Sequence, residues 1–319
     1  MSREEALLHF LARAGRAGWT RRALAGDASA RRYERISGDT GSLILMDADP
    51  ATCGPVQPFL AIREHLYHYG FSAPALWAED QEAGFLLLED FGDALFTRVM
   101  ADDPARELPL YRSAAALLAR LHGKPLPGGL TPMTAEALAA MIAPAFDFYA
   151  PGQSGQLPAV QAAFAEALRP VAAQPAVLAL RDFHAENMVF LSDRKGDRQV
   201  GLLDFQDAFA THPAYDLVSM LQDVRRDVSP GTEEEIIAFF IARTGADSAT
   251  FRAAYALLGA QRNLRILGIF SRLAAARHKP QYLALQPRVW RHLQADLAHP
   301  ALAPIREALA PLPSPVVPA

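Results

Sequence analysis

The sequence has little cysteine, no long apolar stretch and no dense basic run. Its single cysteine, Cys53, cannot form an internal disulfide, so we expect a protein that folds in a reducing compartment. No apolar run approaches the roughly 20 residues that span a bilayer, and the amphipathic start of the chain lacks a signal-peptide core. The 31 basic and 35 acidic residues leave a net charge of −4, and the sequence has no basic cluster of the kind that binds nucleic acid. We therefore expect a cytoplasmic protein that binds neither membranes nor nucleic acid.

Several signatures of other enzyme classes are also missing. No G-x-x-x-x-G-K-[ST] occurs, which excludes a P-loop nucleotide site. HExxH, paired CxxC and G-x-S-x-G are absent as well, so zinc chemistry and a serine hydrolase are disfavoured. At 319 residues and 51% hydrophobic content, the chain is long and apolar enough for two lobes with a real core.

Two polar segments that adjoin apolar runs point to phosphoryl transfer. Asp182 and Asn187 lie five residues apart in the first segment, and Asp204 follows an apolar stretch in the second. Transfer from ATP needs a carboxylate beside the attacking hydroxyl and hard oxygen ligands for Mg²⁺. Asp182 is the candidate catalytic base, and Asn187 and Asp204 are the candidate metal ligands. A charged turn between residues 188–191 and 200–203 predicts a hairpin that brings the two ligands to one end.

These residue types have a simpler interpretation that stays open. Asp and Asn also favour turns, where their side chains bond to the local backbone, so the three residues could be caps alone. The spacing D-x-x-x-x-N, followed seventeen residues later by a D-F after an apolar strand, makes phosphoryl transfer the stronger interpretation.

The same segment resembles the aminoglycoside phosphotransferase and choline kinase superfamily, whose loop reads H-x-D-x-x-x-x-N before I-D-F/W-x-D. The stretch from His212 to Leu217 is similar to the D-P-x-Y-D-L of that family, in which the last Asp steadies the catalytic loop. The resemblance implies an α+β, protein kinase-like fold of two lobes, a small β-rich N-lobe and a larger, mainly α C-lobe. It also implies ATP as the co-substrate and Mg²⁺ as the cofactor.

A narrower resemblance, over most of the chain, is to the anomeric amino-sugar kinases of bacterial cell-wall recycling. It implies phosphorylation of the C1 hydroxyl of N-acetylmuramate and N-acetylglucosamine. The partners are then ATP and a small-molecule amino sugar, and we expect a monomer. The segments that carry the resemblance are residues 25–35, 42–48 and 261–270.

Two positions depart from the family pattern. Leu180 stands where the family has a His that braces the loop, and Met46 stands where kinases place a Lys that pairs with phosphates. An apolar side chain cannot neutralise phosphate charge, so another cation must do so. The candidates for phosphate binding are Ser29, Arg31 and Arg32, although the two arginines could equally lie on an exposed strand face.

The order of predicted elements divides the chain near residue 91. Short strands and two helices fill an N-terminal nucleotide-binding lobe, 1–90, and helices dominate a C-terminal catalytic and sugar-binding lobe, 91–319. In the second lobe we expect helices at 109–122, 134–149, 157–173, 213–224, 232–244, 248–274, 279–298 and 305–310.

An apolar strand at 85–89 turns abruptly acidic where the first lobe ends. By the family resemblance, Leu88, Glu89 and Asp90 form a hinge whose backbone pairs with adenine. An ordinary buried strand that ends in a turn is the alternative.

An aromatic and acidic segment and a basic helix are candidates for the acceptor site. Asp147 and Tyr149 suit a sugar because ring C–H faces pack on aromatics and carboxylates accept from hydroxyls. Arg262 and Arg265 could hold a lactyl carboxylate through charge-assisted bonds, and His184 could donate to a phosphate. The alternatives are core packing for the aromatics, a structural polar network for the arginines and loop packing for the histidine.

Two further functions stay open. An aminoglycoside or other small-alcohol phosphotransferase of the same fold is the first, but residues 261–277 carry several arginines and no acid, which disfavours a polycationic substrate. A nucleotide-binding pseudokinase is the second, motivated by Met46 and Leu180. Magnesium-dependent ATP turnover would exclude it.

Overall fold

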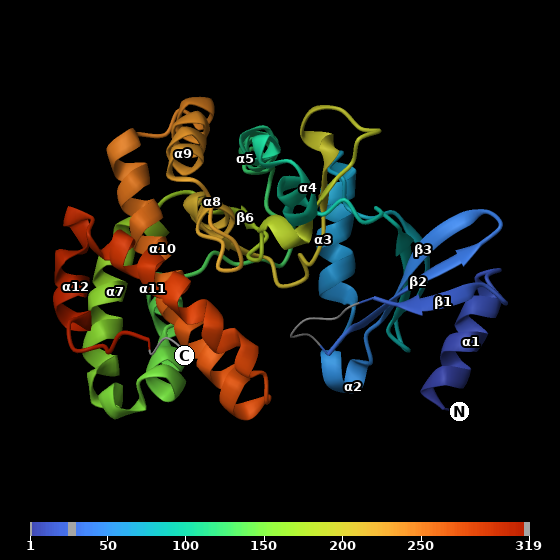
Figure 1. Cartoon of the computed structure of the whole chain (residues 1–319), viewed down its shortest axis with the longest axis horizontal. Coiled ribbons are helices and arrows are strands. Elements are labelled where there is room, and N and C mark those ends of the chain that lie inside the picture. The colour runs from blue at the N-terminus through green and yellow to red at the C-terminus, as the bar shows by residue number, and fades with distance from the viewer. Residues whose placement is uncertain (1, 25–29, 316–319) are drawn as a thin grey trace. The chain divides into compact units, whose positions relative to one another are not determined.

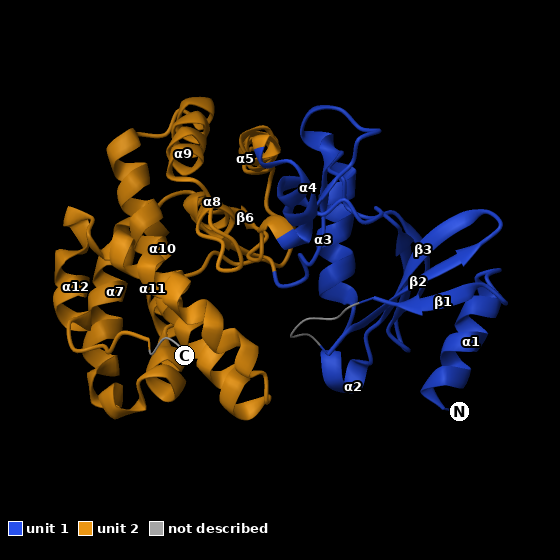
Figure 2. Cartoon of the chain, viewed as in Figure 1, with its two compact units in different colours: residues 1–104, 186–207 blue, residues 105–185, 208–319 orange. Residues whose placement is uncertain are grey.

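The chain, described here from a computed structural model, forms two compact units (Figure 2). The structure describes residues 2–24 and 30–315. Its fold is α+β, as the sequence predicts, with a five-stranded sheet in the first unit and mostly helices in the second. The lobe boundary near residue 91 stays a prediction. Unit 1 comprises Met1–Pro104 and Glu186–Asp207, and unit 2 comprises Ala105–Ala185 and Ala208–Ala319.

Unit 1 is built around an antiparallel sheet with the strand order β1-β2-β3-β5-β4, of which Figure 1 labels the first three strands. Helix α1 (Arg3–Arg13) packs on one face and buries Phe10 and Leu11 against the sheet. The helix begins with a capping box, in which the Ser2 hydroxyl and the Glu5 carboxylate each accept from the other residue's amide. The strands are β1 (Thr20–Ala23), β2 (Arg32–Gly38), β3 (Gly41–Asp47), β4 (Leu76–Asp80) and β5 (Phe85–Glu89).

The other face of the sheet contains the strand position where kinases carry lysine. Side chains alternate between faces along a strand, so Met46 of β3 points away from the face on which Leu45 packs under α1. The strand register places Tyr33 of β2 and Leu86 of β5 directly beside Met46. Met46 is fully buried, so this position is apolar in structure as well as in sequence.

The remaining elements of unit 1 include the predicted hairpin. Strands β7 and β8 pair in antiparallel register with Met188 opposite Leu202, which confirms that prediction. Phe205, just after the hairpin, stacks on Phe59 of α3 with ring centroids 5.0 Å apart. These elements are α2 (Pro50–Cys53), α3 (Gln57–His68), α4 (Phe96–Asp102), β7 (Met188–Phe190) and β8 (Val200–Leu202).

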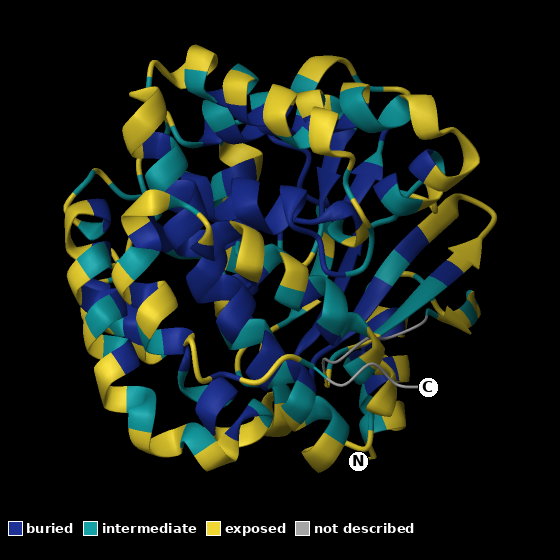
Figure 3. Ribbon diagram, turned by 60° about the vertical axis from the view of Figure 1, so that its left-hand side comes forward, coloured by how far each residue is buried: buried dark blue, intermediate teal, exposed yellow. Residues whose placement is uncertain are grey.

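Helix α10 (Ser248–Ala276), 29 residues long, is the main packing surface of unit 2. Two of its glycines allow close approach: a Cβ at Gly259 would lie 2.5 Å from Oδ2 of Asp296, and one at Gly268 would lie 2.1 Å from the backbone of Pro144. Buried positions lie on the sides of helices that face other helices (Figure 3). None of the described helices is long and apolar enough to cross a membrane. The other elements are α5 (Glu107–Leu121), α6 (Ala135–Ala140), α7 (Leu157–Ala172), β6 (Val177–Ala179), β9 (Phe209–Thr211), α8 (Ala214–Leu221), α9 (Pro230–Thr244), α11 (Gln286–Leu297) and α12 (Ala303–Leu309).

Two segments predicted as continuous helices are interrupted. The prediction for 134–149 is wrong as one helix, because α6 ends at Ala140 and a π-helical turn follows at Ala145–Tyr149. Pro144 precedes that turn, and proline has no amide proton to continue an α-helix. The predicted helix 279–298 likewise divides into a 3₁₀ segment, Pro280–Leu285, and α11.

The two ring nitrogens of His122, at the end of α5, are buried within unit 2, although the residue as a whole is partly exposed. Neither ring nitrogen has a hydrogen-bond partner among the described residues, and the ring packs edge-on against Phe240 with centroids 5.8 Å apart. Burial, with a further contribution from His212, lowers the pKa of His122 to about 3. The folded protein therefore holds this side chain neutral.

We expect His122 to make the protein less stable in acid. The unfolded chain protonates this imidazole near its ordinary pKa of 6.5, whereas the folded chain resists protonation down to about pH 3. As the pH falls below 6.5, the free energy of unfolding should therefore drop by up to about 1.4 kcal/mol per pH unit. Urea unfolding across this range measures the slope, and His122→Leu should reduce it. His9→Leu, at an exposed position of α1, is the control, and an equal slope in the two variants would contradict the prediction.

Candidate active site

The segment that carries Asp182 follows strand β6 in unit 2, where β6 pairs with β9. Asp216 of α8 holds this segment, because its carboxylate accepts from the amide of Leu180 at 2.6 Å and from that of Arg181 at 2.9 Å. Burial raises the pKa of Asp216 to about 7, and the two amide donors oppose that shift. Asp216 thus ties α8 to the backbone immediately before Asp182, as the family resemblance implies.

The backbone turns sharply at Asp182. The preceding residue, Arg181, has a φ of 72°, a left-handed conformation that is uncommon outside glycine. The amide of Asp182 donates to the carbonyl of Leu180 at 2.9 Å, and the amide of His184 donates to the carbonyl of Asp182 at 3.1 Å. Asp182 as a whole is partly exposed.

Three residues predicted for the acceptor site, Arg265, His184 and Arg262, interact electrostatically with one another or with Asp182. Burial lowers the pKa of Arg265, and the charge of Asp182 opposes the shift. His184 is 6% exposed, and burial followed by the charges of Arg225 and Arg262 lowers its pKa well below 6.5. A neutral imidazole cannot offer a positive charge to a phosphate, which favours the loop-packing interpretation of His184.

Arg262 and Asp223 bring opposite charges into the buried interior near this turn. Nη2 of Arg262 donates to the Ser219 hydroxyl at 2.9 Å, while its Nη1 is buried without a hydrogen-bond partner among the described residues. Asp223 is 1% exposed; its Oδ1 accepts from the amide of Arg225 at 2.9 Å, and its Oδ2 likewise has no partner in the described part of the chain. Burial raises the pKa of Asp223, and the charges of Arg225 and Arg262 oppose the shift. The two unpartnered atoms are one donor and one acceptor.

Asp223 is absent from the residues that we predicted for the site. All eight residues of α8 are buried, and the polar pair Gln222-Asp223 follows directly after them, still buried. A polar pair that directly follows a mainly apolar helix is the signal that could have identified this residue.

The predicted pair Asp147 and Tyr149 lies in the π-helical turn after α6. The Tyr149 hydroxyl donates to the carbonyl of Pro313 at 2.6 Å, and its ring centroid lies 6.5 Å from that of Trp290. Asp147 is exposed. Because the hydroxyl of Tyr149 is already bonded within unit 2, a contact with a sugar would use the face of its ring.

The two predicted metal ligands meet at one end of the β7–β8 hairpin in unit 1. The amide of Leu203 donates to the carbonyl of Asn187 at 3.0 Å, next to the last strand pair. Nδ2 of Asn187 lies 3.5 Å from Oδ2 of Asp204, and Nε2 of Gln206 donates to Oδ1 of Asp204 at 2.7 Å. The hairpin therefore does bring Asn187 and Asp204 together, as the sequence predicts.

The chemistry of this pair suits a hard divalent cation. Asp204 is exposed and has a φ of 55°, which Asp tolerates better than most residues. The oxygen and nitrogen of an asparagine amide are assigned from hydrogen bonding, so a cation at Asp204 would attract the amide oxygen of Asn187. Mg²⁺ commonly binds one or two protein oxygens and completes its shell with water and substrate phosphates. The described residues contain no cluster of three or more His, Cys, Asp or Glu that could hold a metal ion.

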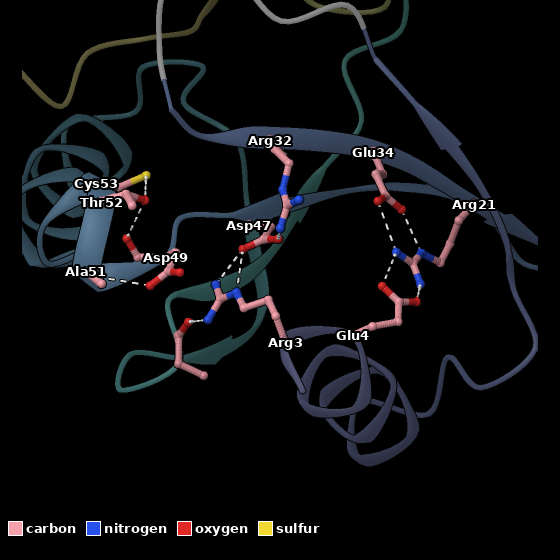
Figure 4. A network of polar contacts seen from close by, with 11 residues as sticks. Arg3, Glu4, Arg21, Arg32, Glu34, Asp47, Asp49, Ala51, Thr52 and Cys53 are labelled. Carbon is pink, nitrogen blue, oxygen red and sulfur yellow. Dashed lines mark hydrogen bonds and ion pairs between the residues drawn. The ribbon is translucent and has the colours of Figure 1, made fainter. Parts of the chain in front are cut away.

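Arg32, one of the two arginines predicted for phosphate binding, forms an ion pair on the α1 side of the sheet (Figure 4). Its Nη2 lies 2.7 Å from Oδ2 of Asp47, and Nε of Arg3 in α1 donates to Oδ1 of Asp47 at 3.0 Å. Arg32 is therefore engaged on the face opposite Met46.

Arg31 has different surroundings. The pKa of Tyr33 is raised by burial and by the charge of Asp204, and is lowered by the charge of Arg31. Arg31 and Asp204 thus both act on a residue that lies beside Met46 in the strand register. Ser29, the third residue predicted for phosphate binding, lies outside the described residues.

The side chains of the predicted hinge take part in ion pairs or packing. Asp90 accepts from Nε and Nη2 of Arg35 at 2.6 and 2.9 Å. Glu89 pairs with Arg194, and Leu88 is buried at 4% exposure. The backbone of Leu88 is paired with strands on both sides, and the amide of Glu89 donates to the carbonyl of Ala75 at 2.8 Å.

A family model described as the phosphotransferase enzyme family matches residues 20–257. The chain belongs to this family. The matched range includes Asp182, Asn187 and Asp204, whereas the acceptor candidates Arg262 and Arg265 lie just beyond its end.

This phosphotransferase is similar, over nearly its whole length, to named sugar kinases. The N-acetylmuramate/N-acetylglucosamine kinase of Caulobacter vibrioides is 36% identical, across 95% of this chain and 95% of that protein. The kinase of the same name in Pseudomonas aeruginosa is 32% identical, across 90% of this chain and 87% of that protein.

Solved structures of phosphotransferases share the fold at low identity. A choline/ethanolamine kinase family protein from Mesorhizobium loti has a TM-score of 0.62 at 17% identity, covering 97% of this chain and 99% of that one. The aminoglycoside phosphotransferase APH(3'')-Id from Streptomyces rimosus, solved with ADP and streptomycin, has a TM-score of 0.52 at 20% identity, covering 81% and 98%. These likenesses confirm the predicted kinase-like fold.

Proposed function

We propose that this phosphotransferase transfers the γ-phosphoryl group of ATP to the anomeric hydroxyl of N-acetylmuramate and N-acetylglucosamine. The observation that carries the proposal is the 36% identity to the Caulobacter kinase across 95% of both chains. The reaction would serve peptidoglycan recycling in the cytoplasm, with the enzyme acting as a monomer.

In the proposed reaction, Asp182 accepts a hydrogen bond from the acceptor hydroxyl and orients that hydroxyl in line with the γ-phosphorus. An anomeric hydroxyl is more acidic than an ordinary alcohol, so a carboxylate base needs only a modest driving force. Asn187 and Asp204 would hold Mg²⁺, which when bound neutralises charge on the phosphates. The bond from Gln206 to Asp204 would keep that ligand in place.

We assign Arg262 and Asp223 to the acceptor sugar. Nη1 of Arg262 is a donor and Oδ2 of Asp223 an acceptor, and both are buried without a partner among the described residues. A buried polar group is costly until it is paired, and a sugar could supply a carboxylate or amide oxygen for the first and a hydroxyl for the second. Arg265 would add a positive charge near Asp182, which suits the lactyl carboxylate of N-acetylmuramate. Other candidates for contact with the sugar, through packing rather than charge, are Asp147, Tyr149 and His184.

For the nucleotide, we assign the backbone at Leu88, Glu89 and Asp90 to adenine, and Ser29 and Arg31 to the phosphates. Arg31 is the better substitute for the lysine missing at Met46, because its charge acts on the strand face that carries Met46. Arg32 is occupied by Asp47 and should contribute little to phosphate binding.

The two adjacent arginines provide a matched pair of variants. Arg31→Ala should raise the KM for ATP about ten-fold or more, because a charge-assisted bond to phosphate contributes roughly 1.5–3 kcal/mol. Arg32→Ala removes the same charge one residue away and should leave the KM within about two-fold. Initial rates at varied ATP measure both, and equal effects of the two changes would refute the assignment.

Two other functions compete with the amino-sugar kinase. An aminoglycoside kinase is favoured by the solved structures that share the fold, one of which holds streptomycin. Arg225, Arg262 and Arg265, however, place positive charge around the Asp182 turn, which disfavours a polycationic acceptor. A pseudokinase is motivated by Met46 and Leu180.

Release of ADP from Mg-ATP in the presence of a panel of acceptors tests the proposal. We expect turnover with N-acetylmuramate and N-acetylglucosamine, and none with their 1-O-methyl glycosides, kanamycin or choline. Turnover with the methyl glycosides would move the reaction to another hydroxyl, and turnover with kanamycin or choline alone would favour the small-alcohol kinase. If the protein binds ATP but releases no ADP with any of these acceptors, the pseudokinase is favoured.

A further inference from the structure

The left-handed turn before Asp182 is held by groups outside the loop. Arg181 has a φ of 72°, a conformation that a residue with a side chain keeps only when its surroundings fix it. Leu180 has an apolar side chain, 3% exposed, that offers no hydrogen bond to the turn. The two amides before Asp182 are held by Asp216, and the carbonyl of Arg181 accepts from the Ser219 hydroxyl at 3.1 Å.

Ser219 is oriented in turn by Arg262. Nη2 of Arg262 in α10 donates to the Ser219 oxygen in α8 at 2.9 Å; Ser219 is fully buried and Arg262 is 5% exposed. A guanidinium can only donate, so the serine oxygen accepts from it and the single hydroxyl proton is left for the Arg181 carbonyl. The hydrogen bonds therefore run in one direction, from Arg262 through Ser219 to the residue that precedes Asp182.

We propose that Ser219 and Arg262 are positioning residues, which hold the carbonyl of Arg181 and thereby aim the carboxylate of Asp182; the inference rests on the role proposed for Asp182. Asp216 and Ser219 are three residues apart, on one face of α8, so a single helix fixes both the amides and the carbonyl of the turn. Loss of the Ser219 hydroxyl frees the carbonyl and lets the turn relax. The consequence falls on the orientation of Asp182, and hence on kcat.

Ser219→Ala separates this role from binding, since Arg262 is also assigned to the acceptor and Ser219 is not. We expect kcat for ADP release to fall at least ten-fold, with the KM for ATP and for the acceptor each within two-fold of wild type. Ser219→Cys, which donates more weakly, should give an intermediate kcat. The matched control is Ser271→Ala, because the Ser271 hydroxyl accepts from Gln286 at 2.8 Å elsewhere in unit 2, and its removal should leave kcat unchanged.

Amide hydrogen exchange of the segment 178–184 tests the same contact without any acceptor. Exchange in this segment should rise in Ser219→Ala and stay at the wild-type rate in Ser271→Ala. A wild-type kcat in Ser219→Ala, or a lowered kcat with unchanged exchange, would overturn the proposal. If wild type turned over none of the acceptors, the proposed function would fail, while the exchange comparison would still decide whether Ser219 holds the turn.

Discussion

We expect Asp182→Asn to lower kcat by roughly 10²–10⁴-fold, the range that general base catalysis contributes. Asparagine has nearly the same size as aspartate but cannot accept the proton of the acceptor hydroxyl. The turn should survive the change, because the hydrogen bonds at this residue that link it to Leu180 and His184 are made by its backbone. The affinity for ATP should stay within about two-fold, since the groups assigned to the nucleotide belong to unit 1. The rate of ADP release gives kcat, and calorimetric titration of ATP gives the affinity.

The control for this substitution is Asp193→Asn, at an exposed position of the turn between β7 and β8. It removes one carboxylate and should leave both kcat and ATP affinity at their wild-type values. Strong residual turnover in Asp182→Asn would reject Asp182 as the base. An equal loss in both variants would point to net charge, rather than position, as the cause.

The sequence was sufficient for those parts of the site that depend on local patterns. The hairpin that joins Asn187 to Asp204 could be predicted, because two short apolar runs flank a charged turn and the register of a hairpin follows from its turn. Strand β5 could be predicted at 85–89, because an apolar run there ends abruptly in acidic residues. Asp216 could be assigned from its place in a family motif, and its bonds to the amides of Leu180 and Arg181 agree with that assignment.

Features that depend on contacts distant in sequence could not be predicted. Arg31 and Arg32 are adjacent in sequence, and no local pattern indicates that Arg32 pairs with Asp47, fifteen residues on. The bond from Arg262 to Ser219 spans 43 residues, and no local pattern indicates which of the arginines in α10 would make it. The break after α6 had a local signal in Pro144, but an amphipathic pattern that continues across a proline is easily taken for one helix.

We also expect a large effect of substitution at Asp204, and its backbone conformation decides which substitution tests metal binding alone. Asp204 has a φ of 55°, where alanine would be strained more than asparagine, so Asp204→Ala would confuse backbone energy with metal binding. Asp204→Asn removes the charge and keeps an oxygen that can still accept from Gln206, which now donates to Oδ1 at 2.7 Å. Any loss in this variant can therefore be attributed to the missing carboxylate.

Asp204→Asn should raise the Mg²⁺ concentration for half-maximal activity roughly ten-fold or more, because one of two proposed protein ligands loses its charge. Binding of ATP should weaken in the presence of Mg²⁺ and should match wild type in EDTA, where the cation cannot bridge the protein and the phosphates. Titration of ATP with and without Mg²⁺ measures this difference, and Asp39→Asn in the exposed turn between β2 and β3 is the control. An unchanged Mg²⁺ dependence in Asp204→Asn would show that this residue does not bind the metal. Its role would then be structural, through its hydrogen bond with Gln206.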